Sequence, residues 1–149
     1  MGPNLAIDIG GTVIVVGVIA AALFAYRAKA GATSVDVTWR LAKETKETGN
    51  TVNGITVEAT NNGTQPVILA AVGFRPSIGT PVTFPWTLTL FPHKLLPGTS
   101  KAIFFPDSAL GAAVKTHGNP GQKVQLIPHF DDIHRHAYRA KPYTITIPS

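Results

Sequence analysis

The sequence predicts an all-β domain of two packed sheets, preceded by one apolar N-terminal helix. Two observations carry this prediction: residues 9–26 contain no charged side chain, and from residue 35 onward apolar and polar side chains alternate between turn-forming residues. A chain of 149 residues has room for one domain and an appendage. We therefore expect a transmembrane helix with its flank over residues 1–30, a linker over 31–34 and a β-sandwich over 35–149.

The apolar run over residues 9–26 is long enough to cross a lipid bilayer. Its 18 residues would extend about 27 Å as a helix, close to the roughly 30 Å hydrocarbon core of a bilayer. A cleaved signal peptide is the main alternative, but the preceding residues include Asp8 and neither Lys nor Arg. The expected lipid anchor consists of Ile9, Val13, Val16, Ile19, Leu23, Phe24 and Tyr26.

Charged residues beside the apolar run predict the orientation of the chain. Arg27 and Lys29 follow the run directly, whereas Asp8 precedes it. Basic residues favour the cytoplasmic side of a membrane span. The sequence therefore predicts a single-pass protein with its C-terminal domain in the cytoplasm, or one held in a virion membrane.

Period-two alternation predicts seven short strands after the linker. Val35, Val37 and Trp39 show the pattern, because alternate strand residues point to opposite faces. On this pattern Trp39 and Trp86 belong to the core. The predicted strands are Val35–Arg40, Ile55–Ala59, Pro66–Arg75, Val82–Leu90, Lys101–Phe105, Lys123–Phe130 and Tyr143–Ile147.

Turn residues separate these strands. Asn61–Thr64 tolerates positive φ, Pro97–Gly98 suits the centre of a type II turn, and a last turn is expected around Asp131–Asp132. Asp107 or Ser108 can cap a short helix that runs through Lys115. About seven short strands with one helix are typical of an immunoglobulin-like β-sandwich.

The order of these turns resembles that of small immunoglobulin-like domains from uncharacterised single-pass bacterial or phage membrane proteins. The resemblance rests on Asn62–Val67, Val72–Phe74, Leu96–Ser100 and a closing hairpin around Asp132 with Arg135 and Tyr138. Many of those proteins have one N-terminal membrane helix and no assigned activity, so the resemblance implies a fold more than a function. His134 departs from the pattern, because it stands near the position where a turn glycine is usual.

The segment 128–136 contains the densest group of chemically active side chains. Imidazole and carboxylate groups together can bind zinc or another divalent ion. The weak candidate ligands are His129, Asp131, His134 and His136, and Arg135, Arg139 and Lys141 place positive charge around them. We therefore predict neither a metal nor another cofactor. Asp131 and Asp132 do not suit a catalytic pair, because adjacent strand residues point to opposite faces.

Other features argue against catalysis and against nucleic-acid binding. The chain has no cysteine and no Gly-x-Ser-x-Gly motif, so the usual signatures of nucleophilic catalysis are missing. The net charge of +5 is scattered and forms no basic stripe. We predict a protein that is not an enzyme and has no nucleic-acid partner.

Three functional hypotheses remain. The first is a membrane-anchored, non-enzymatic protein-interaction or scaffolding module whose partners are the lipid bilayer and another protein or copies of itself. The second is a structural subunit of a virion or pilus-like assembly. The third, less favoured, is a metal-dependent enzyme that uses the histidine cluster.

Overall fold

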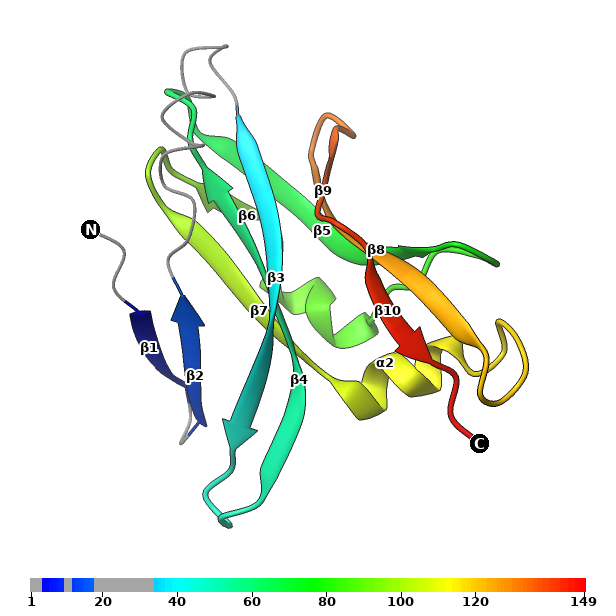
Figure 1. Cartoon of the computed structure of the whole chain (residues 1–149). Coiled ribbons are helices and arrows are strands. Elements are labelled where there is room, and N and C mark those ends of the chain that lie inside the picture. Colours follow the sequence, from blue (N-terminus) through cyan, green and yellow to red (C-terminus); the bar gives the residue numbers. More distant parts are fainter. Residues whose placement is uncertain (1–3, 10–11, 18–33) are drawn as a thin grey trace.

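The computed structural model describes residues 4–9, 12–17 and 34–149, and the part from residue 34 onward consists of two antiparallel sheets (Figure 1). The first sheet has the order β3-β4-β7, with β3 (Val35–Thr45), β4 (Thr51–Asn61) and β7 (Ser100–Pro106). The second has the order β10-β8-β5-β6, with β10 (Tyr143–Thr146), β8 (Lys123–Asp132), β5 (Val67–Pro76) and β6 (His93–Leu95), and β9 (Ala137–Arg139) also pairs with β8. The all-β class is confirmed, with eight strands in these sheets where seven were predicted.

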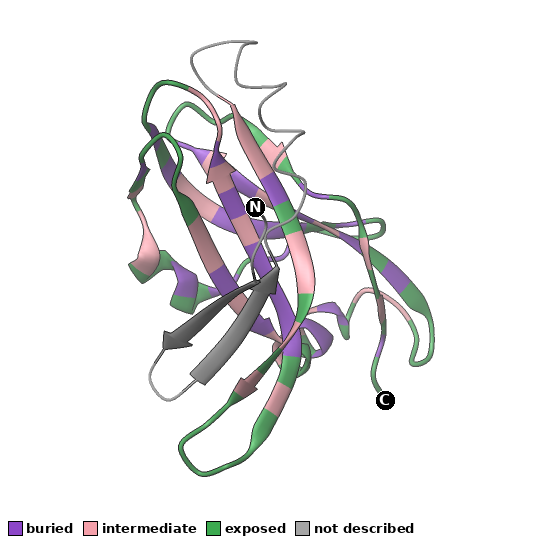
Figure 2. Ribbon diagram, turned by 60° about the vertical axis from the view of Figure 1, so that its left-hand side comes forward, coloured by how far each residue is buried: buried purple, intermediate pink, exposed green. Residues whose placement is uncertain are grey.

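A single apolar core fills the space between the two sheets. On β4, Ile55, Val57 and Ala59 are buried, whereas their neighbours on the strand include partly exposed residues (Figure 2). From the second sheet, Leu126 and Phe130 of β8 join the same cluster. On β8 the alternation seen in the sequence is therefore the division between core and surface, whereas on β4 all residues from Gly54 to Val57 are buried.

Two of the three predicted turns form where their residue types suggested, whereas the last turn lies at 133–136 and not at Asp131–Asp132, which end β8. The side chain of Asn61 is buried and donates to the carbonyls of Gln65 (2.8 Å) and Leu95 (2.9 Å), which ties the β4–β5 turn to β6. Gly98 has a φ of 79°, as the third position of a type II turn requires. These contacts confirm the turns at Asn61–Thr64 and Pro97–Gly98.

The predicted strand over residues 82–90 does not form, and Val82 makes only an isolated β-bridge with Phe74. Pro85–Leu90 forms the 3-10 helix η2, because proline lacks a ladder donor and suits the first turn of a helix. Trp86 and Leu88 are consequently 45% and 66% exposed, so Trp86 does not belong to the core. Trp39, by contrast, is partly buried and packs against the core as predicted.

The short helix forms, but its cap differs from the prediction. Helix α2 spans Asp107–Val114, and Pro106 occupies the N-cap position without a side-chain cap. Asp107 lies instead in the first turn, where its negative charge favours the helix dipole. Leu110 and Val114 bury one face of α2 against the core.

The N-terminal part differs from the predicted helix where the structure describes it. Strands β1 (Asn4–Ile9) and β2 (Thr12–Gly17) pair antiparallel, so the anchor residues Ile9, Val13 and Val16 lie in strands. The run of β-branched residues in β2 favours extended backbone, which explains the difference. Outside the described residues lie Ile19, Leu23, Phe24, Tyr26, Arg27, Lys29 and linker residues 31–33.

A membrane span is not found in the described part of the chain. None of the helices there has both the length and the apolar character needed to cross a bilayer. The transmembrane helix was predicted over the run 9–26, of which Ile9 and residues 12–17 lie in strands. Residues 18–26 lie outside the described residues, so the membrane span stays a prediction.

The strand directions give the sandwich two distinct ends. Val35 pairs with Asn61, Val67 with Leu95, and Leu69 with Asp132, so Ser34 and the turns 61–66, 96–99 and 133–136 gather at one end. We call this the entry end. The opposite end carries the turn 46–50 and the C-terminal residue Ser149 (Figure 1).

Candidate functional site

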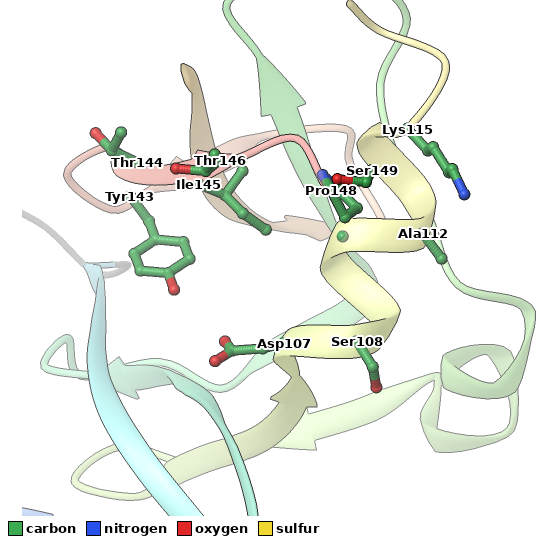
Figure 3. A pocket seen from close by; sticks show the side chains of 11 residues that line it. Asp107, Ser108, Ala112, Lys115, Tyr143, Thr144, Ile145, Thr146, Pro148 and Ser149 are labelled. Atoms are coloured by element: carbon green, nitrogen blue, oxygen red, sulfur yellow. The ribbon is translucent and has the colours of Figure 1, made fainter. Parts of the chain in front are cut away.

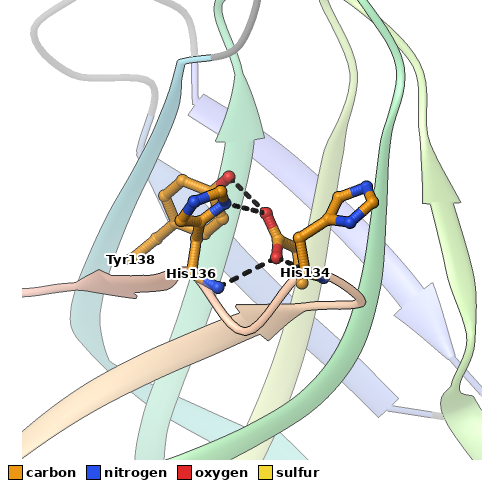
Figure 4. A network of polar contacts seen from close by, with 4 residues as sticks. His134, His136 and Tyr138 are labelled. Carbon is orange, nitrogen blue, oxygen red and sulfur yellow. Dashed lines mark hydrogen bonds and ion pairs between the residues drawn. The ribbon is translucent and has the colours of Figure 1, made fainter.

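The hairpin between β8 and β9 is organised by one buried carboxylate. Asp132 is only 6% exposed, and its side chain accepts hydrogen bonds from the Tyr138 hydroxyl (2.7 Å) and from the backbone N–H groups of His134 (2.8 Å) and His136 (3.0 Å). The His136 ring also approaches it, with Nδ1 3.2 Å from Oδ2 (Figure 4). The carboxylate therefore accepts hydrogen bonds from backbone N–H groups in the turn, which have no partner in the β8–β9 pairing.

The same turn contains His134, which stands near the position where the resembling domains usually have a glycine. Arg135 has a φ of 66°, a left-handed conformation that is uncommon outside glycine. Its N–H donates to the Asp132 carbonyl at 3.0 Å, and the Asp132 N–H donates to the His136 carbonyl at 3.0 Å. The left-handed position thus falls on Arg135, one residue after His134, and the Asp132 contacts hold it.

These contacts shift two pKa values. Burial by itself would raise the pKa of Asp132, but the hydrogen bonds from Tyr138, His136 and His134 outweigh burial and hold that pKa below its ordinary value. The pKa of Tyr138 is raised, first by burial and then by the hydrogen bond to the negative carboxylate. The network is therefore stable with Asp132 ionised and Tyr138 protonated.

The lowered pKa of Asp132 predicts a loss of stability in acid. A carboxyl whose pKa is lower in the folded state stabilises the fold above its unfolded pKa of about 3.9, and this contribution disappears as the pH falls through the folded value. We expect the free energy of unfolding to fall more steeply below about pH 4 in the wild type than in Asp132→Asn. Denaturant unfolding at a series of pH values measures the difference.

The comparison with Asp132→Asn isolates this one group. Burial raises the pKa of Glu58, although Arg40 opposes the shift, and a raised carboxyl pKa adds stability as the pH falls. Both proteins contain Glu58, so its contribution cancels in the difference. Parallel pH curves for the two proteins would show that Asp132 has the same pKa folded and unfolded.

The four metal-ligand candidates do not form one site. His129 and Asp131 lie on the outer side of β8, with Nδ1 3.1 Å from Oδ1, whereas the rings of His134 and His136 lie in the turn with centroids 6.5 Å apart. In residues 34–149 no three His, Asp or Glu side chains come close enough to hold a metal ion. Asp132 is buried and Asp131 is partly exposed, as expected for adjacent strand residues that point to opposite faces.

A groove that the sequence did not reveal lies between α2 and the free edge of β10 (Figure 3). Its volume is about 560 Å³, within the range of ligand sites. The helix side of the groove is formed by Asp107, Ser108, Gly111 and Ala112 of α2 and by its C-cap residue Lys115. The C-terminal segment contributes Tyr143, Thr144, Ile145, Thr146, Pro148 and Ser149.

The groove combines charged ends with an unpaired strand edge. The N–H of Ile147 donates to the Gln122 carbonyl, so the backbone N–H and C=O groups of the odd-numbered residues Tyr143 and Ile145 are directed toward β8. The backbone groups of Thr144 and Thr146 therefore point away from β8. Burial and the nearby Asp107 carboxylate raise the pKa of Tyr143, whose hydroxyl stays protonated as a donor. The groove can therefore offer backbone hydrogen bonds, one carboxylate and the ammonium of Lys115.

The prolines on either side of β10 are the sequence feature from which its edge position could have been predicted. Pro142 and Pro148 flank β10, and proline is confined to edge strands or strand ends. The position of α2 beside that edge depends on long-range packing and left no local pattern.

Taken together, the described residues from 34 onward form a β-sandwich with a carboxylate-stabilised hairpin and an open strand edge beside a groove. Comparisons of the chain with protein-family models, curated proteins and solved structures found no match.

Proposed function

We propose that the chain is a membrane-anchored, non-enzymatic protein-interaction module whose immunoglobulin-like sandwich binds an extended segment of a partner protein at the β10 edge. The observation that carries the proposal is the unpaired edge of β10 beside the groove formed with α2. Added strands gain affinity from backbone hydrogen bonds and specificity from pockets for alternate side chains.

The sheet membership of the strands supports the immunoglobulin-like part of this proposal. An immunoglobulin sandwich places its first, second and fifth strands in one sheet and its third, sixth and seventh in the other. Here β3, β4 and β7 share one sheet, and β5, β8 and β10 share the other. Strand β6 then takes the place of the additional strand that some such domains pair with the third one.

The β10 edge is better suited to pairing with an added strand than to enclosing a small molecule. The edge offers the backbone groups of Thr144 and Thr146, and Asp107 and Lys115 lie on the helix across the groove. A partner strand with side chains of both charges can pair with both residues. The flanking prolines limit the contact to a short segment, which protects the free protein from edge-to-edge aggregation.

The membrane part of the proposal rests on the sequence. The uncharged run over residues 9–26 is the proposed bilayer anchor, on its composition alone, since the structure has Ile9 and residues 12–17 of it in strands β1 and β2. Arg27 and Lys29 favour a cytoplasmic position for the sandwich. Ser34 lies beside Asn62 at the entry end, whereas Ser149, which borders the groove, lies at the other end (Figure 1). The groove is therefore directed away from the bilayer, where a partner protein can reach it.

Substituting Thr144→Pro tests the edge directly. The N–H of Thr144 faces away from β8, so proline removes a donor from the free edge and leaves the β8–β10 ladder intact. Full-length wild-type and Thr144→Pro chains, each with a photocrosslinker at position 149, are irradiated in membranes of the native host. We expect the variant to yield at least ten-fold less crosslinked partner than the wild type. The matched control Thr144→Ala keeps the N–H and should retain the partner.

Each result of this experiment decides between hypotheses. A folded Thr144→Pro variant that keeps its partner would contradict binding at the edge. If the crosslinked species is a second copy of the chain, the structural-subunit hypothesis replaces the interaction module. Thermal unfolding of the variant separates a lost interaction from a lost fold.

A further inference from the structure

Three exposed aliphatic side chains gather at the entry end of the sandwich. Ile68, Leu96 and Ile133 are 36%, 48% and 49% exposed. They come from three separate segments: β5, the β6–β7 turn and the β8–β9 turn. Surface loops and strand ends are usually polar, so three exposed aliphatic residues from separate segments at one end need an explanation.

The backbone contacts place these residues close together. The N–H of Ile133 donates to the carbonyl of Ile68 at 3.0 Å, which joins the β8–β9 turn to the start of β5. Ile68 pairs in register with Lys94 of β6, and Leu96 follows the last residue of that strand. Leu95 between them is fully buried, so Lys94 and Leu96 are directed outward.

Positive charge surrounds this apolar group. Lys94 and Arg135 are both exposed. The carboxylates of the same end are engaged within the protein: Asp36 accepts from Asn62 (2.9 Å), Asp131 contacts His129 (3.1 Å), and Asp132 is buried in the hairpin network. Exposed aliphatic residues beside free cations match the interface of an anionic bilayer, where apolar groups insert and cations meet headgroups.

The chain that precedes this end holds it near the predicted membrane. Ser34 lies beside Asn62, because the Asn62 N–H donates to the Ser34 carbonyl at 2.7 Å. Only residues 27–33 separate the apolar run from Ser34. A chain of this length spans at most about 25 Å even when fully extended. The entry end is therefore the part of the sandwich that the anchor brings to the bilayer surface.

We propose that the entry end rests on the anionic leaflet, with Ile68, Leu96 and Ile133 inserted at the level of the headgroups and with Lys94 and Arg135 on lipid phosphates. This proposal rests on the membrane anchoring proposed above and adds a second contact with the bilayer. The contact fixes the orientation of the sandwich and keeps the β10 groove directed away from the lipid.

Single-cysteine labelling of the full-length chain tests the proposal, because the chain has no cysteine of its own. An environment-sensitive fluorophore is attached to Leu96→Cys, Ile133→Cys, Leu23→Cys or Ser149→Cys in phosphatidylcholine vesicles with and without phosphatidylglycerol. Lipids that carry a spin label near the headgroup quench fluorophores that reach the interface. We expect quenching at positions 96 and 133 in the anionic vesicles, and none at position 149.

The four positions separate failure of this contact from failure of the anchor. One outcome is that lipids spin-labelled deep in the acyl chains quench the label at position 23, while the labels at positions 96 and 133 are not quenched. This outcome would overturn the second contact with the bilayer and would leave the proposed anchor in place. A label at position 23 that no lipid quenches would overturn the proposed anchor and this inference with it.

The charge requirement has its own measurement. Lys94→Gln and Arg135→Gln, introduced into the Leu96→Cys chain, should each weaken the contact by about five-fold in anionic vesicles, as expected for one basic residue near a charged surface. Lys123→Gln is the matched control, because Lys123 is exposed at the opposite end of β8. Equal quenching in neutral and anionic vesicles would overturn the role of the cations.

Discussion

Replacing Asp132 with alanine should lower the free energy of unfolding by about 3 kcal/mol, because the substitution leaves buried donors without an acceptor. The Tyr138 hydroxyl and the backbone N–H groups of His134 and His136 all lose their partner. The left-handed conformation of Arg135 loses its support in the same step. Denaturant unfolding followed by tryptophan fluorescence measures the effect, since both tryptophans, Trp39 and Trp86, lie in the sandwich.

Tyr138→Phe provides the matched control for this prediction. It removes only the 2.7 Å hydrogen bond from the hydroxyl and leaves the carboxylate with its backbone donors. A loss of about 1 kcal/mol is expected for a single bond of this kind. Equal losses for the two variants would mean that the backbone contacts of Asp132 contribute nothing to the hairpin.

Replacing Phe105 with alanine should have the largest effect, a loss of about 3–5 kcal/mol in the free energy of unfolding. The Phe105 ring is fully buried and its centroid lies 4.9 Å from that of Phe74 and 5.5 Å from those of Phe84 and Trp86. Alanine would leave a cavity where β7, β5 and the segment before η2 meet. The shift in the urea midpoint measures the loss.

Two further variants show whether this loss comes from the cavity. Phe105→Leu keeps most of the volume and should cost under about 1.5 kcal/mol. Leu88→Ala, at a side chain that is 66% exposed, should change stability by less than about 0.5 kcal/mol. A Phe105→Ala protein as stable as the Leu88→Ala protein would contradict the central position of Phe105 in the core.

The strands and turns of the sandwich could be predicted because local residues determine them. Alternation placed Ile55, Val57 and Ala59 in the core, and Gly98 marked a turn that needs positive φ. Alternation misled at Trp86, where the same spacing of aromatic and apolar residues occurs in a 3-10 helix that begins at Pro85. The sequence contained that proline, but its effect depends on whether the segment has a strand to pair with.

The candidate sites were harder to predict because they depend on contacts between distant residues. The histidine cluster suggested a metal site, yet strand parity separates His129 and Asp131 from the turn that carries His134 and His136. The role of Asp132 could not be predicted, because it depends on how the turn directs the backbone N–H groups of His134 and His136 toward its carboxylate. The groove requires α2 to lie beside β10, more than 20 residues further along the chain.

The positions of Ser34 and Ser149 at opposite ends of the sandwich determine how the domain would respond to mechanical load. Tension between a fixed N-terminus and a pulled C-terminus acts along the axes of β3 and β10, each of which pairs antiparallel with its neighbour, β4 or β8. The force therefore shears these two ladders, and many hydrogen bonds must break together instead of opening one after another. The sandwich should therefore resist extension best along the line that joins Ser34 to Ser149.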